Sequence, residues 1–371
     1  MGFAPPPILD DALAQLPELS PIARVRARRR FDGLSAELGV FAGFETALEL
    51  CAAVSGDEHL ACMDRPQTLC VLADNGIARR WPRAGKPTLD ILHALMNGSS
   101  PASQIAQSVG ARLTLADAGI AARVQPKSSR EDITFTSLKL RRGTGDISRN
   151  MAMSEDDAED LLLAGIKLAQ SLPEQSLVIM AGGGRASEVS SATLNAALNG
   201  EHEDIEIPRR PEGFDDIALG DARRLILAAL VQHQTGLGDP IGILSSVGGF
   251  EHAVLAGAII GCAIRRSPMM IDGYAAAASA AWLVSFCPHI AAFLIPADSS
   301  LPAPWLRVGL APAVHSAGVS GCEGLAGMLA ASSLQHVLRV YRQVSVEDAE
   351  PGGFEVDLGS VERKDGQKVA E

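Results

Sequence analysis

Basic and aromatic side chains are scarce in this sequence of 371 residues. Lys and Arg number 32 against 44 Asp and Glu, which gives a formal net charge of −12 at pH 7, and aromatic residues make up 4% of the chain. A general nucleic-acid-binding protein needs a basic surface that displaces counterions from phosphates, so we expect no nucleic-acid partner. The one basic run, residues 24–30, is most simply a solvated helix face. Because aromatic residues are few, Ala, Leu, Ile and Val must fill the core.

Patterns typical of metal sites, disulfides and hydrolytic triads are missing too. The six cysteines form no CxxC pair and no zinc-type spacing, so we interpret them as reduced thiols of the core. None of the eight histidines stands in an HExxH arrangement, and no GxSxG elbow occurs. These absences disfavour a zinc enzyme and a serine hydrolase.

No apolar run suits a membrane crossing. The run 253–264 is shorter than the ~20 residues that a span needs, and Arg265 and Arg266 end it. The longer run 274–295 is rich in alanine and contains Pro288, which fits a packed helix that ends at a turn. The first residues lack the basic segment and apolar stretch of a secretory signal. We predict a soluble cytoplasmic protein with no membrane partner.

Short apolar runs alternate along the chain with amphipathic segments of helix length. This alternation is typical of parallel strands joined by helices. We therefore predict an α/β fold with a doubly wound, mostly parallel sheet flanked by helices. The candidate strands are TLCVLAD (68–74), ARLTLAD (111–117), SLVIMAG (176–182) and PMMIDG (268–273), with HIAAFLIPA (289–297) as a further possibility.

Helical patterns at both ends of the chain predict a small subdomain beside the sheet. Residues 1–60 and 321–345 are expected to pack together as this helical subdomain, and residues 61–320 to form an α/β nucleotide-binding domain. The remaining segment, 346–371, is rich in charge and glycine with few apolar residues, so we predict that it is disordered.

Acidic residues stand at the ends of three predicted strands, at Asp74, Asp117 and Asp272. The carboxyl ends of parallel strands face the ligand crevice of an open sheet, which makes these carboxylates candidates for binding. An aspartate at such a position can equally cap the turn or helix that follows. The pattern leaves both roles open.

A glycine-rich segment, MAGGGRAS (180–187), lies between a predicted strand and a predicted helix. Backbone amides at such a junction can bind a phosphate at the helix N-terminus, and Arg185 and Ser187 would add side-chain donors. The segment is neither a GxGxxG motif nor a Walker A loop. A tight turn is therefore the alternative to an anion site.

Five segments between residues 68 and 340 resemble, in order, those of one enzyme family. They are VLADNGI (71–77), NGSSPASQIAQSVGARLTLADAGI (97–120), RRGTGDISRNMAMSEDDAEDLLLAGIKLA (141–169), SSVGGFEHAVLAGAIIGCAIRRSPMMIDGYAAAASA (245–280) and VSGCEGLAG (319–327). The fourth is the most specific, because Gly-Gly-x-Glu, Ala-Gly-Ala and Asp-Gly occur in the expected order and spacing. The chain is thus similar to the nicotinate-nucleotide:dimethylbenzimidazole phosphoribosyltransferases, which make the lower-ligand nucleotide of cobalamin.

The resemblance implies that Glu323 occupies the position of the catalytic base. The implied reaction moves the phosphoribosyl group of nicotinate mononucleotide to a benzimidazole nitrogen, releases nicotinate and inverts the anomeric carbon. A carboxylate in a poorly solvated pocket accepts the ring proton of the acceptor well, because burial raises its pKa. The scheme requires no metal ion or other cofactor, since the leaving group is nicotinate rather than pyrophosphate. We expect small-molecule substrates and a homodimer.

The resemblance also implies a set of substrate contacts spread over the strand ends and loops. These residues are Asp74, Trp81, Gly182, Gly183, Gly184, Arg185, Ser187, Arg210, Gly248, Gly249 and Asp272.

The functional loops depart from the family pattern. Met180 stands at the glutamate of the family's Gly-rich loop, Asn75 replaces a His, and RRPEGFDD (209–216) keeps part of a Gly-Arg-Gly-Thr-Gly-Leu-Asp-Asp segment. Two hypotheses follow. One is an active enzyme with a shifted substrate range in which Arg185 holds the phosphate, and the other is a non-catalytic paralogue that binds a nucleotide or serves as a partner subunit.

Overall fold

The computed structural model describes residues 3–32, 41–81, 84–125, 130–200, 205–207, 215–300, 311–319, 321 and 323–343. Its centre is a six-stranded sheet in the order β3-β2-β1-β4-β5-β6, in which every neighbouring pair is parallel. The strands are β1 (Gln67–Ala73), β2 (Arg112–Gly119), β3 (Ile133–Ser137), β4 (Val178–Gly183), β5 (Met269–Ile271) and β6 (Leu294–Pro296). The predicted doubly wound parallel sheet is confirmed.

Strand β3 is the one element of the sheet that the sequence prediction missed. Its sequence, ITFTS, is short and mixes apolar with hydroxyl side chains, and only Ile133 is buried along it. It pairs with β2 alone, at the edge of the sheet. A strand that is exposed on one side lacks the continuous apolar run by which the five others were recognised.

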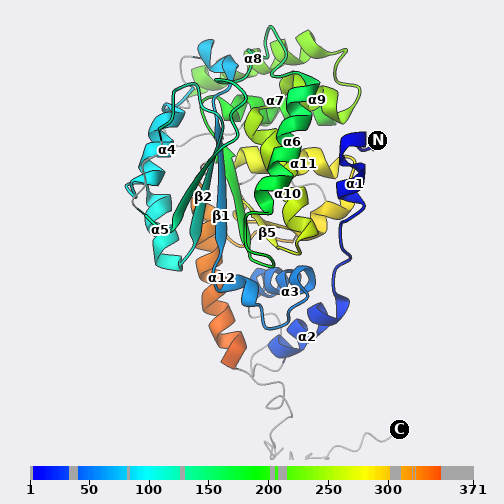
Figure 1. Ribbon diagram of the computed structural model, residues 1–371, viewed down its shortest axis with the longest axis vertical. Coiled ribbons are helices and arrows are strands. Elements are labelled where there is room, and N and C mark those ends of the chain that lie inside the picture. Colours follow the sequence, from blue (N-terminus) through cyan, green and yellow to red (C-terminus); the bar gives the residue numbers. More distant parts are fainter. Residues whose placement is uncertain are drawn as a thin grey trace, which may run out of the picture.

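Helices cover both faces of the sheet. Figure 1 shows α4 (Thr88–Met96) and α5 (Pro101–Val109) on one side and α6 (Glu155–Ala169), α10 (Phe250–Ile264) and α11 (Tyr274–Val284) on the other. Successive residues of a strand point to opposite faces. In β1, Leu69 and Val71 belong to the core on the α6 and α10 side, and Cys70 and Leu72 to the core on the α4 and α5 side.

The remaining helices complete the two layers and the chain ends. They are α1 (Asp10–Leu13), α2 (Pro21–Asp32), α3 (Gly43–Ser55), α7 (Ser187–Asn199), α8 (Asp216–His233), α9 (Pro240–Val247) and α12 (Leu325–Gln343). The basic run lies in α2, where Arg26 pairs with Glu58 and Arg28 pairs with Glu49. The run is therefore a helix face, as predicted, but acidic residues neutralise part of it.

Helices α2 and α12, from opposite ends of the sequence, meet below the sheet, whereas α1 lies against α10 (Figure 1). The rings of Phe31 in α2 and Tyr341 in α12 lie 4.9 Å apart between centroids, and the Tyr341 hydroxyl donates to the carbonyl oxygen of Glu58 at 2.6 Å. These contacts support a joint helical subdomain. Its boundaries at residues 60 and 320 stay a prediction, and the predicted disordered tail lies outside the described residues.

Helices α6 and α10 approach each other closely at glycines. A β-carbon on Gly165 would collide with the Val254 carbonyl oxygen, and one on Gly257 would collide with the Leu162 carbonyl oxygen. Glycine at both positions lets the two backbones touch. In the part of the chain that the structure describes, no helix is both long and apolar enough to cross a membrane.

The described cysteines match the prediction of core thiols with one exception. Cys51, Cys62, Cys70 and Cys262 are buried, whereas Cys287 is half-buried at the end of α11. Burial raises the pKa of Cys262 to about 12, because the thiolate would lose its hydration.

Candidate active site

The strand order reverses between β1 and β4, which places the predicted site at their carboxyl ends. Open α/β sheets bind ligands at this reversal, where the loops from the two halves diverge. Asp74 and Asn75 follow β1 there, and Gly182–Arg185 end β4 beside them. The structure thus brings two of the predicted segments together.

The glycine-rich loop is tightly packed. Gly183 and Gly184 have φ angles of 149° and 150°, a region that disfavours other residues, and a β-carbon on Gly184 would collide with the Ala73 carbonyl oxygen. The Ser187 amide donates to the Gly184 carbonyl oxygen at 3.2 Å, and the Ala186 amide donates to the Ala84 carbonyl oxygen at 3.2 Å. The amides of Ser187 and Ala186 are therefore engaged in hydrogen bonds that hold the loop in its own conformation.

Arg185 carries the loop's cationic side chain. It is half-buried and lies two residues before α7, near the positive end of that helix. Its amide donates to the Thr88 hydroxyl oxygen at 3.0 Å, and its carbonyl oxygen accepts from the Asn75 amide at 3.1 Å. Its Nε is buried and has no hydrogen-bond partner among the described residues. The guanidinium is therefore a candidate donor to an anion at this edge.

Ser187 points inward. Its hydroxyl donates to Oε1 of Glu251 at 2.7 Å, and the same oxygen accepts from Nδ2 of Asn75 at 2.8 Å. Glu251 is completely buried in the first turn of α10. A buried carboxylate is costly without donors, and here two side chains and the N-terminus of α10 supply stabilisation.

Gly249 makes room for this buried cluster, and Gly248 makes room for the end of α9. A β-carbon on Gly249 would lie 2.5 Å from Oε2 of Glu251 and 2.8 Å from Oδ1 of Asn75. A β-carbon on Gly248 would collide with the Leu244 carbonyl oxygen. The role of Glu251 went unassigned in the sequence analysis, although a single carboxylate in the apolar helix FEHAVLAGAIIG was a usable signal.

The Asp74 carboxylate is occupied by protein donors. Oδ1 accepts from the Thr88 hydroxyl at 2.6 Å, and Oδ2 accepts from the Ala121 amide at 2.6 Å. Asp74 thereby ties β1 to α4 and to the loop after β2. Asp117 behaves similarly, because its carboxylate accepts from the Ile120 amide at 2.8 Å and pairs with Lys139 at 2.7 Å. The capping alternative thus describes Asp117, which accepts from the turn that follows it, whereas Asp74 instead joins segments that are distant in sequence.

Asp272 lies beneath the start of α12. It is buried, and its Oδ2 accepts from the Gly327 amide at 2.8 Å. Burial raises the pKa of Asp272 to about 7, against the opposing effect of backbone hydrogen bonds from Gly327 and Ala326. Asp272 therefore anchors the first turn of the helix that follows Glu323.

Glu323 lies two residues before α12 and is half-buried. Burial raises the pKa of its carboxyl, while a hydrogen bond with the Ser100 hydroxyl and the Lys86 charge act in the opposite direction. A β-carbon on the next residue, Gly324, would lie 2.7 Å from Cγ2 of Thr68 in β1 and 3.5 Å from Cβ of Ala181 in β4, so this segment packs over the two central strands. Ser100, which caps α5, and Lys86 were missed from sequence because their partner is more than 200 positions away.

Two predicted residues stand apart from this cluster. Trp81 is completely buried in the core cluster on the α6 and α10 side, so its ring serves packing in this structure. Arg210 lies outside the described residues, as does most of the segment 209–216.

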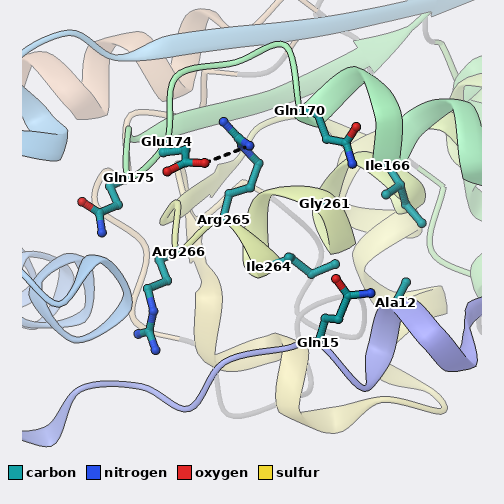
Figure 2. Close-up of a pocket in the computed structure, with 10 residues that line it drawn as sticks. All are labelled: Ala12, Gln15, Ile166, Gln170, Glu174, Gln175, Gly261, Ile264, Arg265 and Arg266. Carbon is teal, nitrogen blue, oxygen red and sulfur yellow. Dashed lines mark ion pairs between the residues drawn. The ribbon is translucent and has the colours of Figure 1, made fainter.

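A cavity at the opposite edge of the sheet is separate from this site. Figure 2 shows this cavity of about 370 Å³ where α6 and α10 end, next to the N-terminal segment. Arg265 is engaged there by Glu174 at 3.2 Å and by the Leu172 carbonyl oxygen at 2.9 Å. Arg266 donates to the Glu18 carbonyl oxygen at 3.2 Å. The cavity contains none of the predicted site residues.

Comparison with known proteins gives one family. The model of the DBI_PRT family, described as phosphoribosyltransferase, matches residues 16–350. The nicotinate-nucleotide–dimethylbenzimidazole phosphoribosyltransferase of Chloroflexus aurantiacus is 30% identical over 298 residues, covering 79% of this chain and 83% of the relative. The enzyme of that name from Roseiflexus sp. (strain RS-1) is 28% identical over 346 residues, covering 91% and 96%.

Solved structures share the fold. The crystal structure of CobT from Thermus thermophilus matches with a TM-score of 0.76 at 22% identity, covering 89% of this chain and 98% of the other. A crystal structure titled as the nicotinate-nucleotide–dimethylbenzimidazole phosphoribosyltransferase of the same organism matches with a TM-score of 0.75 at 21% identity, with the same coverage of both chains.

Proposed function

Because the chain belongs to the family of nicotinate-nucleotide–dimethylbenzimidazole phosphoribosyltransferases, we propose that it transfers the phosphoribosyl group of nicotinate mononucleotide to a benzimidazole-type base. The products are nicotinate and an α-ribazole-type phosphate, a step of cobalamin lower-ligand assembly. The observation that carries the proposal is the half-buried Glu323, whose pKa is raised by burial and whose neighbour Gly324 packs on β1 and β4, the two strands between which the strand order reverses.

In the proposed reaction Glu323 acts as general base. The acceptor nitrogen forms a bond to the anomeric carbon from the face opposite nicotinate, and the bond from that carbon to the pyridine nitrogen breaks. The electron pair of the broken bond leaves with nicotinate, and the proton on the acceptor ring passes to the Glu323 carboxylate. A raised pKa suits this transfer, since a stronger base takes the proton more readily near neutral pH.

The phosphate of nicotinate mononucleotide binds at Arg185 in this proposal. The guanidinium lies at the positive end of α7, and charge-assisted bonds to phosphate are strong. Ser187, in contrast, supports the loop from below, because its single proton is donated to Glu251. Asp74, Gly182–Gly184, Gly248 and Asp272 keep the loops and α12 in place.

A non-catalytic paralogue is the second candidate function. It is favoured by Met180, which stands where the resemblance places a glutamate, and by the inward orientation of Ser187. Such a protein would bind a nucleotide, or assist a partner subunit, without turnover. The retained Glu323 favours the enzyme.

Turnover is the measurement that separates the two. Purified protein is incubated with nicotinate mononucleotide and a panel of benzimidazoles and phenols, and nicotinate release is followed by chromatography. Release that depends on the acceptor base, with formation of the matching ribotide, supports the enzyme. Binding of the nucleotide without release of nicotinate supports the paralogue.

We further propose a homodimer that works in the cytoplasm on small-molecule substrates. Light scattering after size-exclusion chromatography gives the mass in solution. A mass equal to that of one chain of 38.8 kDa contradicts the homodimer.

A further inference from the structure

We propose that Thr88 is a positioning residue that holds the backbone of Arg185, and with it the guanidinium, in place at the proposed phosphate site. The inference rests on the proposed function, because that proposal has Arg185 bind the phosphate. It concerns a hydroxyl that joins two segments 97 positions apart, the segment 84–88 and the glycine-rich loop.

Thr88 is the first residue of α4 and has 1% of its surface exposed. Its hydroxyl donates to Oδ1 of Asp74 at 2.6 Å and accepts from the Arg185 amide at 3.0 Å. A hydroxyl has one proton and two lone pairs, so both bonds form at once. Because Asp74 takes the proton, a lone pair is left to receive the Arg185 amide.

Asp74 is itself fixed from its other oxygen. The Ala121 amide donates to Oδ2 at 2.6 Å, so the carboxylate cannot turn away from Thr88 without losing that bond. The connected bonds therefore run from the loop after β2, through Asp74 and Thr88, to the backbone of Arg185. Hydrogen bonds to a charged group are stronger than neutral ones, and bonds connected through one group reinforce one another.

A second bond joins the same two segments. The Ala186 amide donates to the Ala84 carbonyl oxygen at 3.2 Å, next to the bond between Arg185 and Thr88. Between these two attachment points lies Lys86, whose charge acts on Glu323. The segment 84–88 is thus held to the glycine-rich loop at both of its ends, and the charge of its middle residue lowers the pKa of the proposed base.

The packing leaves little freedom around the hydroxyl. A β-carbon on Gly184 would lie 2.8 Å from Oγ1 of Thr88, so the loop backbone sits directly against it. Removing the hydroxyl but keeping the side-chain volume leaves the Arg185 amide without its acceptor. A buried amide that loses its partner favours a shifted loop, and the Arg185 side chain shifts with it.

The test compares Thr88→Val, which has no hydroxyl, with Thr88→Ser, which keeps it. Thr193→Val is the matched control, because Thr193 is also completely buried and donates to the Val189 carbonyl oxygen within α7, away from the loop. The dissociation constant for nicotinate mononucleotide is measured by calorimetry. We expect a rise of about tenfold in Thr88→Val and a change of less than about twofold in the two other variants.

A double-mutant cycle with Arg185→Ala shows whether Thr88 acts through Arg185. If it does, Thr88→Val weakens binding far less when Arg185 is already absent, because the two changes remove one interaction. Additive effects overturn the positioning role. If Thr88→Val does not fold, Thr88→Ala enters the same cycle.

Hydrogen exchange supplies a readout that needs no ligand and no turnover. Peptides that contain the Arg185 amide should exchange faster in Thr88→Val and at the wild-type rate in Thr88→Ser. Unchanged exchange in Thr88→Val overturns the inference even if the enzyme is active. Absence of turnover in the wild-type protein, with faster exchange in Thr88→Val, overturns the proposed function and keeps Thr88 as the residue that positions Arg185.

Discussion

The Ser187 hydroxyl and the Glu251 carboxylate form a hydrogen bond of 2.7 Å across 64 positions of sequence. Ser187 is the first residue of α7 and Glu251 is in the first turn of α10, so the bond joins two helix N-termini. Both helices favour negative charge at this end. A carboxylate buried at this junction explains how the glycine-rich loop is supported from inside the protein.

Ser187→Ala should reduce stability more than nucleotide affinity. The variant removes one of two side-chain donors to a buried carboxylate, and a hydrogen bond to a charged group contributes about 1.5–3 kcal/mol. Urea unfolding measures the loss, with the exposed Ser108→Ala on α5 as control. A tenfold weaker affinity for nicotinate mononucleotide at unchanged stability would instead indicate a direct phosphate contact.

Gly249→Ala and Gly220→Ala should change stability in opposite directions. A methyl group at position 249 meets Oε2 of Glu251 and Oδ1 of Asn75, and we expect a destabilisation of about 1–3 kcal/mol. Gly220 lies within α8 with open space around it, so alanine there should stabilise the protein by about 0.5–1 kcal/mol. Denaturant titration checks both values. Equal effects at the two positions contradict the steric argument.

Glu323→Gln should abolish most turnover and leave nucleotide binding nearly unchanged. The amide keeps the shape of the side chain but cannot accept the proton, which should lower kcat by about 10²-fold or more. Steady-state kinetics and calorimetry measure the two quantities. Wild-type kcat in the variant excludes Glu323 as the base.

Arg185→Ala should weaken binding of nicotinate mononucleotide by about 1–3 kcal/mol, the contribution of a charge-assisted bond. Arg29→Ala is the matched control, since Arg29 is exposed in α2 and its replacement removes the same charge from the molecule. Calorimetry at low and high salt measures the change. Equal losses in the two variants would point to a long-range charge effect.

The pH dependence of stability should change when Asp272 is replaced by Asn. The folded-state pKa of Asp272, about 7, is above its ordinary value of 3.8, so between these values the folded protein holds a proton that the unfolded chain releases. The contribution of this group to stability therefore falls as pH rises from 4 to 7, by at most about 1.4 kcal/mol per pH unit. Asp272→Asn lacks this dependence.

Unfolding of both proteins at several pH values checks this prediction. The difference in unfolding free energy between wild type and Asp272→Asn should shift in favour of the variant as pH rises toward 7. A constant difference across the range shows that Asp272 does not titrate there.

The sheet could be predicted because its strands are buried on both faces. Five of the six read as apolar runs, and the parallel arrangement follows from the intervening helices. The edge strand β3 lacks that signal. Residue composition and order were enough to predict the central strands. An exposed edge strand is held by pairing with its neighbour, and its own sequence carries little signal.

The site was predicted less completely, because its contacts join distant residues. Asp74 and Ser187 stood out by position and chemistry, but the groups that their side chains bond to could not be read from local sequence. Thr88 lies 97 positions from Arg185, and Glu251 lies 176 positions from Asn75. The contact between the rings of Phe31 and Tyr341, which are far apart in the sequence, could not be predicted from local sequence for the same reason.

The glycine contact between α6 and α10 bears on how this protein can be engineered. Gly257 lies six residues after Glu251 in one continuous helix, about 9 Å along its axis. Any side chain introduced at that contact pushes the helix outward and displaces the buried carboxylate with it. A library that seeks new acceptor bases should therefore vary residues 85–87 and hold Thr88, Gly165 and Gly257 constant, because substitutions at the contact between α6 and α10 would destabilise variants whose binding pocket is otherwise intact.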